Sequence, residues 1–207
     1  MRRFHFTNAW IAAGLLVGVA VCQADKKASD TNPATLPTPT AVLKPGAPME
    51  RLLRAFEGTW AIHEKFAAGP SRPNGATSEG KIVWRPGPGG FSLVEDYKSK
   101  QGDRQVTGLG VFWWDESAGG YRTIWCDSTN PGGCISFKNV VRWDGAQLVL
   151  VEDYEMNGKK FTFKEVFSDI TSGTFTQTLY GAEAGGALKV DQTVRATKST
   201  HGQASRK

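Results

Sequence analysis

The sequence predicts an all-β protein in which about ten antiparallel strands close into an up-and-down barrel behind one short N-terminal helix. Three observations favour this fold. Gly accounts for 24 of the 207 residues and aromatic residues for 11%, a composition typical of short strands and tight turns. Apolar and polar residues alternate with a period of two over most of the chain after Gly58. The breaks between these segments are short, which favours antiparallel neighbours and a closed barrel, with a β-sandwich as the alternative.

The first residues, 1–24, have the pattern of a secretory signal peptide. A basic start precedes an apolar run at 9–22 that is too short for a permanent membrane span. Cleavage is expected after Ala24, because small residues precede that bond. Lipid attachment at Cys22 is the alternative, although Val21 is larger than the residue that usually precedes a lipidated cysteine. We therefore expect an exported protein, periplasmic or secreted, that contacts a membrane only if Cys22 is lipidated.

A Pro-rich spacer and a short helix follow. Residues 25–47 contain Pro, Thr, Ala and Lys but few large apolar side chains, so they cannot bury enough surface to offset the entropy of ordering. We expect this spacer to be disordered. Beyond it, Met49, Leu52 and Phe56 recur at helical spacing, which predicts an amphipathic helix over 48–56.

Ten segments then carry the alternation of strands. They are expected at 59–67, 79–86, 91–98, 104–114, 120–127, 134–143, 147–155, 160–168, 173–180 and 187–198. Turn-forming pairs such as Asp144-Gly145 separate them. The barrel domain should therefore span residues 48–198, and residues 199–207 should form a flexible basic tail.

Two cysteines remain after the predicted signal peptide, Cys126 and Cys134, on either side of the turn DSTNPGG. Alternation places both side chains on the outer face of two paired strands, which favours a disulfide across the hairpin in an oxidising compartment. We expect a structural bond, with a redox-active pair as the less favoured alternative, because the spacing differs from CxxC.

Composition and missing motifs exclude several classes of function. Apolar residues make up 40% and charged residues 22%, which is typical of a globular protein. The net charge of +5 includes Arg2 and Arg3 of the predicted signal peptide, so the remaining balance is too mild to imply nucleic acid. The GxSxG elbow of serine hydrolases is missing, so we expect no Ser-His-Asp site. We expect no cofactor and no metal, because the sequence lacks a GxGxxG phosphate-binding pattern and EF-hand spacing. The sequence sets no oligomeric state.

The ends of the predicted barrel resemble the calycins, or lipocalin-like β-barrels. Gly58-Thr59-Trp60 opens the first strand directly after the helix, and Arg195 lies near the end of the last strand. In that fold a basic side chain from the final strand packs over the indole at the barrel start. The resemblance therefore implies a structural cation–π contact between Trp60 and Arg195.

The middle of the chain resembles a bacterial family of secreted proteins known only as a domain of unknown function. The matching stretches are Gly89-Gly90-Phe91, GLGVFWWDESAGGY at 108–121 and WCDS at 125–128. The resemblance implies a barrel with an interior cavity for a small ligand, and nothing about activity. Haem-binding relatives of this fold use a histidine, but His63 shares the outward face of its strand, so haem is not implied.

Alternation places one glutamate on the inner face of each of four strands. The inner faces read Trp60/Ile62/Glu64/Phe66, Phe91/Leu93/Glu95/Tyr97, Leu148/Leu150/Glu152/Tyr154 and Phe161/Phe163/Glu165/Phe167. The same count finds no inward Lys or Arg. A dry core cannot hold four unpaired carboxylates. Either the interior is a wet cavity, or a bulge shifts the register and the glutamates face solvent near the rim.

We therefore favour a non-enzymatic barrel that binds a small molecule. The candidate ligand-binding residues are Glu64, Glu95, Tyr97, Trp125, Glu152, Tyr154 and Glu165, with Trp60 and Trp84 as further apolar walls. A cavity of this composition suits a cationic or hydroxyl-rich ligand. One alternative is a hydrolase or isomerase that uses Glu95 or Glu152 as acid or base. The other is an interaction module of the cell envelope tethered by the spacer.

Overall fold

The computed structural model describes residues 43–69, 72–156, 158–183 and 185–199. The predicted signal peptide, most of the spacer and the tail beyond Ser199 lie outside these residues and stay predictions. The described residues form one α-helix, one 3₁₀ helix and eleven strands: α1 Ala47–Phe56, β1 Gly58–Phe66, β2 Ala76–Pro86, η1 Pro88–Gly90, β3 Ser92–Gln101, β4 Arg104–Asp115, β5 Gly120–Asp127, β6 Cys134–Ser136, β7 Arg142–Asp144, β8 Gln147–Met156, β9 Lys159–Ser168, β10 Thr174–Glu183 and β11 Lys189–Lys198. Among them, no helix combines the length and hydropathy needed to span a membrane.

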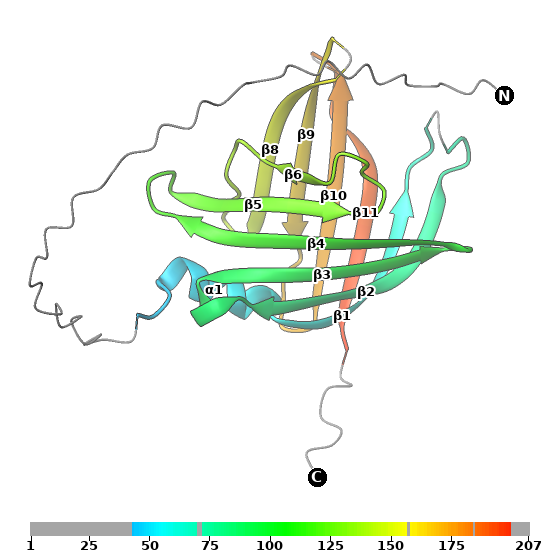
Figure 1. Cartoon of the computed structure of the whole chain (residues 1–207). Helices are drawn as coiled ribbons and strands as arrows, with labels where there is room; N and C mark the ends of the chain where they lie inside the picture. The colour runs from blue at the N-terminus through cyan, green and yellow to red at the C-terminus, as the bar shows by residue number, and fades with distance from the viewer. Residues whose placement is uncertain (1–42, 70–71, 157, 184, 200–207) are drawn as a thin grey trace, which may run out of the picture. The chain divides into compact units, whose positions relative to one another are not determined.

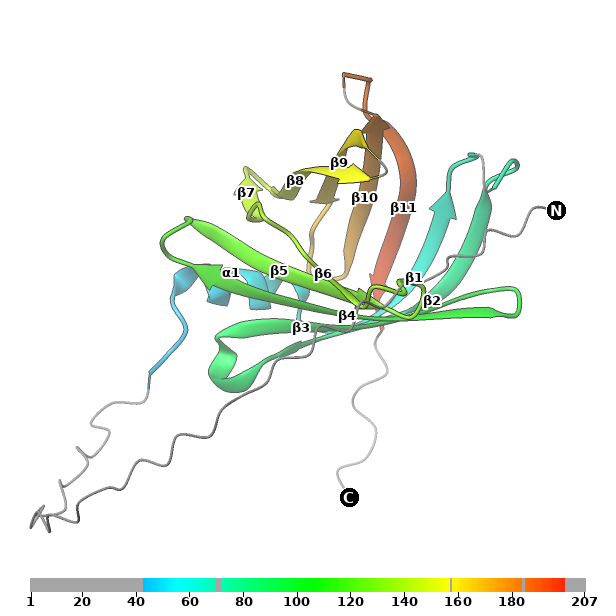
Figure 2. The ribbon, with the colours of Figure 1, turned by 45° about the horizontal axis from the view of Figure 1, so that its top comes forward.

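All strands belong to one antiparallel sheet in the order β6-β5-β4-β3-β2-β1-β11-β10-β9-β8-β7. Strands that are neighbours in sequence pair with each other except β6 and β7, and the pairing of β1 with β11 joins the two ends of the fold. The sheet curls so that β3, β4 and β5 face β8, β9 and β10 (Figures 1 and 2). The predicted all-β, up-and-down fold with a short N-terminal helix is confirmed, in the form of a curled half-barrel.

We expected one strand at 134–143. The structure has two short strands there, β6 and β7, and the residues between them belong to no strand. β6 pairs with β5, whereas β7 pairs with β8. Residues 134–144, which we call the crossing segment, therefore run from one edge of the sheet to the other. The ladder breaks because the backbone N–H groups of Lys138 and Asn139 donate to the Glu152 carboxylate, at 3.3 and 2.9 Å.

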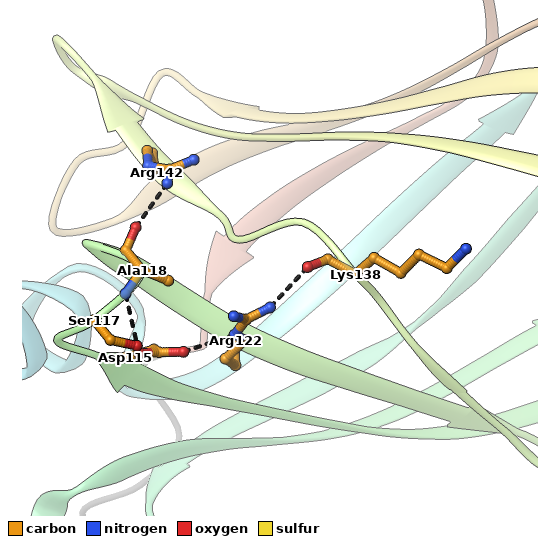
Figure 3. A network of polar contacts seen from close by, with 6 residues as sticks. All are labelled: Asp115, Ser117, Ala118, Arg122, Lys138 and Arg142. Atoms are coloured by element: carbon orange, nitrogen blue, oxygen red, sulfur yellow. Dashed lines mark hydrogen bonds and ion pairs between the residues drawn. The ribbon is translucent and has the colours of Figure 1, made fainter.

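Side chains of the β4–β5 hairpin hold the other side of the crossing segment (Figure 3). Arg122 donates to the carbonyl oxygen of Lys138 at 2.7 Å, and Arg142 donates to that of Ala118 at 2.7 Å. Hydrogen bonds from Ser117 and Arg122 hold the pKa of Asp115 below its usual range, so the anion that orients Arg122 stays ionised. The crossing segment thus links β5 to β8, whose ladders do not meet.

Helix α1 fills one end of the half-barrel. Its buried face presents Phe56, whose ring packs within 5.5 Å, centroid to centroid, of Trp84, Phe167 and Phe175. The Trp60 indole N–H donates to the Phe56 carbonyl at 2.7 Å, which fixes the entry into β1. The interior at this end is packed with aromatic rings.

We predicted that the Arg195 side chain packs over the Trp60 indole. In the structure the basic side chain over this ring is Lys198. The Lys198 ammonium lies 5.1 Å from the ring centroid. Trp60 pairs with Lys198 in the register, whereas Arg195 pairs with His63 on the outer face and is exposed. Because strand residues an odd number apart face opposite sides, Arg195 cannot reach a ring that Lys198 covers.

Candidate functional site

A cavity of about 340 Å³ lies in the half of the barrel away from α1. Its walls come from the ends of β1, β3 and β5 and the beginnings of β2 and β4, together with β9, β10 and β11. The lining residues are Glu64, Phe66, Arg72, Ser78, Glu95, Tyr97, Ser99, Gln101, Arg104, Val106, Phe112, Thr123, Trp125, Asp127, Thr129, Phe137, Phe163, Glu165, Gln177, Leu179, Gln192 and Val194. Aromatic side chains and carboxylates therefore share one hollow, as alternation predicts.

Five of the seven candidate residues line this cavity: Glu64, Glu95, Tyr97, Trp125 and Glu165. Two do not. Glu152 is buried, but its carboxylate accepts hydrogen bonds from the backbone of the crossing segment. Tyr154 is 44% exposed and stacks on Phe161. Trp60 and Trp84 lie in the packed core at the α1 end.

Glu64 has all the donors that its carboxylate can use. The side chain is fully buried, and it accepts hydrogen bonds from Ser78, Ser99, Tyr97 and Gln192. All four donors are uncharged, and they come from β2, β3 and β11. Glu64 therefore ties three strands together and fixes the Tyr97 ring, so its role in the cavity is to position other groups.

Glu95 is the contrasting case. Its side chain is only 5% exposed, and no described residue donates a hydrogen bond to it. Burial raises the pKa of this carboxyl well above its usual value, and the nearby Glu165 and Asp96 raise it further. The cross-strand neighbour is Gly110, where an added Cβ would lie 2.9 Å from the Glu95 Oε2 atom. The glycine thus leaves the room that the carboxyl occupies.

Glu165 faces the same space from β9. Gln177 donates to its Oε1 atom at 2.5 Å, which leaves the second oxygen free of described donors. Burial raises the pKa of Glu165 to about 7, and the bond from Gln177 limits the rise. Glu95 and Glu165 are therefore two buried carboxyls that line the same cavity, and each has an oxygen that no described residue donates to.

Aromatic rings complete the walls. Tyr97 and Trp125 meet edge to face with centroids 5.6 Å apart, and the Trp125 indole donates to Asp127 at 2.9 Å. Phe137 of the crossing segment stacks on Phe163, another residue of the lining, with ring centroids 6.1 Å apart. Room for the indole comes from Gly108, because an added Cβ there would lie 2.5 Å from the Trp125 ring.

Two cations near the open end correct the expectation of an interior without Lys or Arg. Arg104 begins β4 and shares the parity of Phe112, so the alternation of that strand could have found it. Arg72 comes from the β1–β2 connection, where alternation does not apply. It lies over the Phe66 ring at 4.5 Å and contacts Asp191 at 3.4 Å.

The predicted disulfide is present between Cys126 and Cys134, and it joins β5 to the start of the crossing segment. His63 lies on the outer face as expected, 3.6 Å from Glu79. Within the described part of the chain, no three His, Cys, Asp or Glu side chains gather in a way that could hold a metal ion.

Comparison with known proteins identifies a family but no activity. The model of a family described as "Protein of unknown function (DUF1579)" matches residues 45–196. No curated protein matches the chain.

Several solved structures resemble it at low identity. Rv2717c from M. tuberculosis is 12% identical, with 74% of this chain and 98% of that one covered and a TM-score of 0.49. The S-type phycobiliprotein lyase CPES from Guillardia theta is 7% identical, with 72% and 92% covered and a TM-score of 0.43. A designed fluorescence-activating β-barrel is 12% identical, with 70% and 94% covered and a TM-score of 0.38. All three TM-scores are below 0.5, so the description of the fold rests on the strand order of the chain itself.

Proposed function

The chain belongs to the DUF1579 family of proteins of unknown function, and from that premise we propose that it binds a small molecule in the cavity of its half-barrel. One observation carries the proposal: the Glu95 carboxyl is buried, lacks a donor among the described residues and faces an aromatic hollow. A ligand that donates to this carboxyl would supply the hydrogen bonds that the described residues do not.

The size of the hollow supports the same proposal. Packed interiors contain few voids larger than a water molecule, whereas ligand pockets occupy about 300–1,000 Å³. A volume of about 340 Å³ suits a compact metabolite and is small for a long lipid chain. The proposed ligand contacts are Glu95, Glu165, Tyr97 and Trp125, with Glu64 positioning Tyr97.

The proposal is tested with N-phenylnaphthylamine, an uncharged dye whose fluorescence rises in an apolar site. Titration into the full chain should give saturable fluorescence. Leu179→Trp, which adds a large ring to the cavity wall, should abolish it. Thr178→Trp makes the same addition on the adjacent, oppositely facing position of β10 and should bind like the unmodified chain. Equal binding by both variants, or no saturable signal in the parent, would contradict the proposal.

We further propose that binding takes place outside the cytoplasm. The signal-peptide pattern of residues 1–24 and the pairing of Cys126 with Cys134 both support this location. The test is cell fractionation of chains with and without residues 1–24. Recovery of the full chain in the cytoplasm with both thiols free would contradict it.

Acid–base catalysis is the second candidate, and the observation that favours it is the paired carboxyls. A carboxyl with a pKa of about 7 can both take up and release a proton near neutral pH, which catalytic acids and bases require. Glu95 and Glu165 would then be the acid and base, and Glu152 would not, because it binds the crossing segment. The test is loss of any turnover, with retained dye binding, in Glu95→Gln.

A further inference from the structure

We propose that the ligand of this cavity is a small organic ammonium ion whose N–H groups donate to both Glu95 and Glu165 and whose apolar body packs on the aromatic walls. This inference rests on the proposed function, since it names the class of molecule that the same cavity takes.

The first argument is the inventory of hydrogen-bonding groups. In the deep part of the cavity, the hydrogen bonds recorded for the lining donors go to acceptors other than Glu95. Ser78, Ser99, Tyr97 and Gln192 donate to Glu64, Gln177 donates to Glu165, and Trp125 donates to Asp127. The carboxyl oxygens that no described residue donates to are the two of Glu95 and the second one of Glu165. A complementary ligand must therefore bring donors, and more than one of them.

The second argument is charge. Two carboxyls that are buried near each other repel when both are ionised, and a neutral ligand does nothing to relieve that repulsion. A cation between the two carboxylates offsets the cost of burying their charges and the repulsion between them. An anionic ligand would add to that repulsion. The cations of the lining, Arg72 and Arg104, lie near the open end, and Arg72 is already engaged with Asp191 and the Phe66 ring. They leave the deep pair unneutralised.

The third argument is the character of the walls. The rings of Tyr97, Trp125, Phe112, Phe137 and Phe163 line the same hollow as the pair. An ammonium ion gains from the faces of such rings, most of all where water is excluded. An apolar substituent on the nitrogen would fill the remaining volume against them.

Ammonium binding requires both carboxyls to be ionised, so it should release protons. The pKa of Glu95 is raised by burial and by Glu165, and that of Glu165 is raised to about 7 by burial. Affinity for an ammonium ion should therefore increase with pH as the two carboxyls lose their protons, Glu165 at about pH 7. The other ionisable groups around the pair are Glu64 on β1, Asp96 and Tyr97 on β3, Arg104 on β4, Asp127 on β5 and Arg72.

Three probes that share a phenethyl group and differ in charge test the inference. Phenethylammonium, phenethyl alcohol and hydrocinnamate are titrated calorimetrically into the full chain near neutral pH, in two buffers of different ionisation enthalpy. The ammonium ion should bind at least tenfold more tightly than the alcohol and should release protons to the buffer. Hydrocinnamate should bind most weakly.

Variants locate the effect. Glu95→Gln and Glu165→Gln should each weaken ammonium binding about tenfold or more while leaving the alcohol within about threefold, and the retained alcohol binding shows that the variants are folded. Glu79→Gln changes an exposed carboxyl on the outer face and serves as the matched control, with no change for any probe. Equal binding of ammonium and alcohol, absence of proton release, or failure of the ammonium ion to bind at millimolar concentration would overturn the inference. In those cases dye binding that is blocked by Leu179→Trp would still uphold the cavity as a binding site.

Discussion

Replacing Glu152 by Ala should destabilise the protein without abolishing dye binding. Glu152 is 7% exposed, and its carboxylate accepts hydrogen bonds from two backbone N–H groups at 2.9 and 3.3 Å. A hydrogen bond to a charged group contributes about 1.5–3 kcal/mol, and the longer bond contributes less. We expect a loss of about 2–4 kcal/mol in the free energy of unfolding. For a domain of this size that loss corresponds to a fall in Tm on the order of 5–15 °C.

Urea unfolding followed by tryptophan fluorescence measures this loss. Glu155→Ala removes a carboxylate from the same strand at an exposed position and should cost less than about 0.5 kcal/mol. Glu152→Gln keeps one acceptor oxygen and should fall between the two. Equal stability of Glu152→Ala and Glu155→Ala would show that Glu152 does not hold the crossing segment. The argument that leaves Glu152 out of the ligand site would then fail.

Three further predictions concern charge, the disulfide and the indole cover. The unfolded chain releases the Glu165 proton above about pH 4.5, whereas the folded protein holds it to about 7, so the free energy of unfolding should fall by about 2–3 kcal/mol as the pH rises between these values. Urea unfolding at a series of pH values should show this slope reduced in Glu165→Gln, and an unchanged slope would contradict the assigned burial. Reduction of the bond between Cys126 and Cys134 should cost about 2–3 kcal/mol of stability, and thermal unfolding with and without reductant should differ accordingly. Lys198→Ala should lower stability by about 0.5–1 kcal/mol while Arg195→Ala has almost no effect; the reverse order in thermal denaturation would restore Arg195 as the cover of Trp60.

The period-two pattern predicts the interior well because side-chain direction alternates along a regular ladder. Glu64, Glu95 and Glu165 were expected inside, and all three line the cavity. The competing expectation, a bulge that turns these glutamates to solvent, is wrong for them. What alternation cannot supply is the partner of each carboxyl. Glu64 has four donors and Glu95 has none among the described residues, although both occupy the same kind of position.

The crossing segment shows where the pattern misleads. Residues 134–143 alternate well enough to resemble one strand. Residues 137–141 nevertheless bond to the side chains of Glu152 and Arg122, and only Val141 pairs with a strand residue, in an isolated bridge to Tyr121. Such a bond joins residues far apart in the sequence, so local periodicity carries no sign of it. The prediction therefore placed Glu152 in the ligand site instead of beneath the crossing segment. The cover of Trp60 was missed for a simpler reason, since register decides whether Arg195 or Lys198 faces inward.

A crystal structure of the full chain grown with phenethylammonium tests the central claim most directly. We predict density for the ligand inside the half-barrel, with its nitrogen within hydrogen-bonding distance of Glu95 and Glu165 and its ring against Trp125. A hollow filled by the protein's own side chains, or a ligand bound only on the outer surface, would contradict the account.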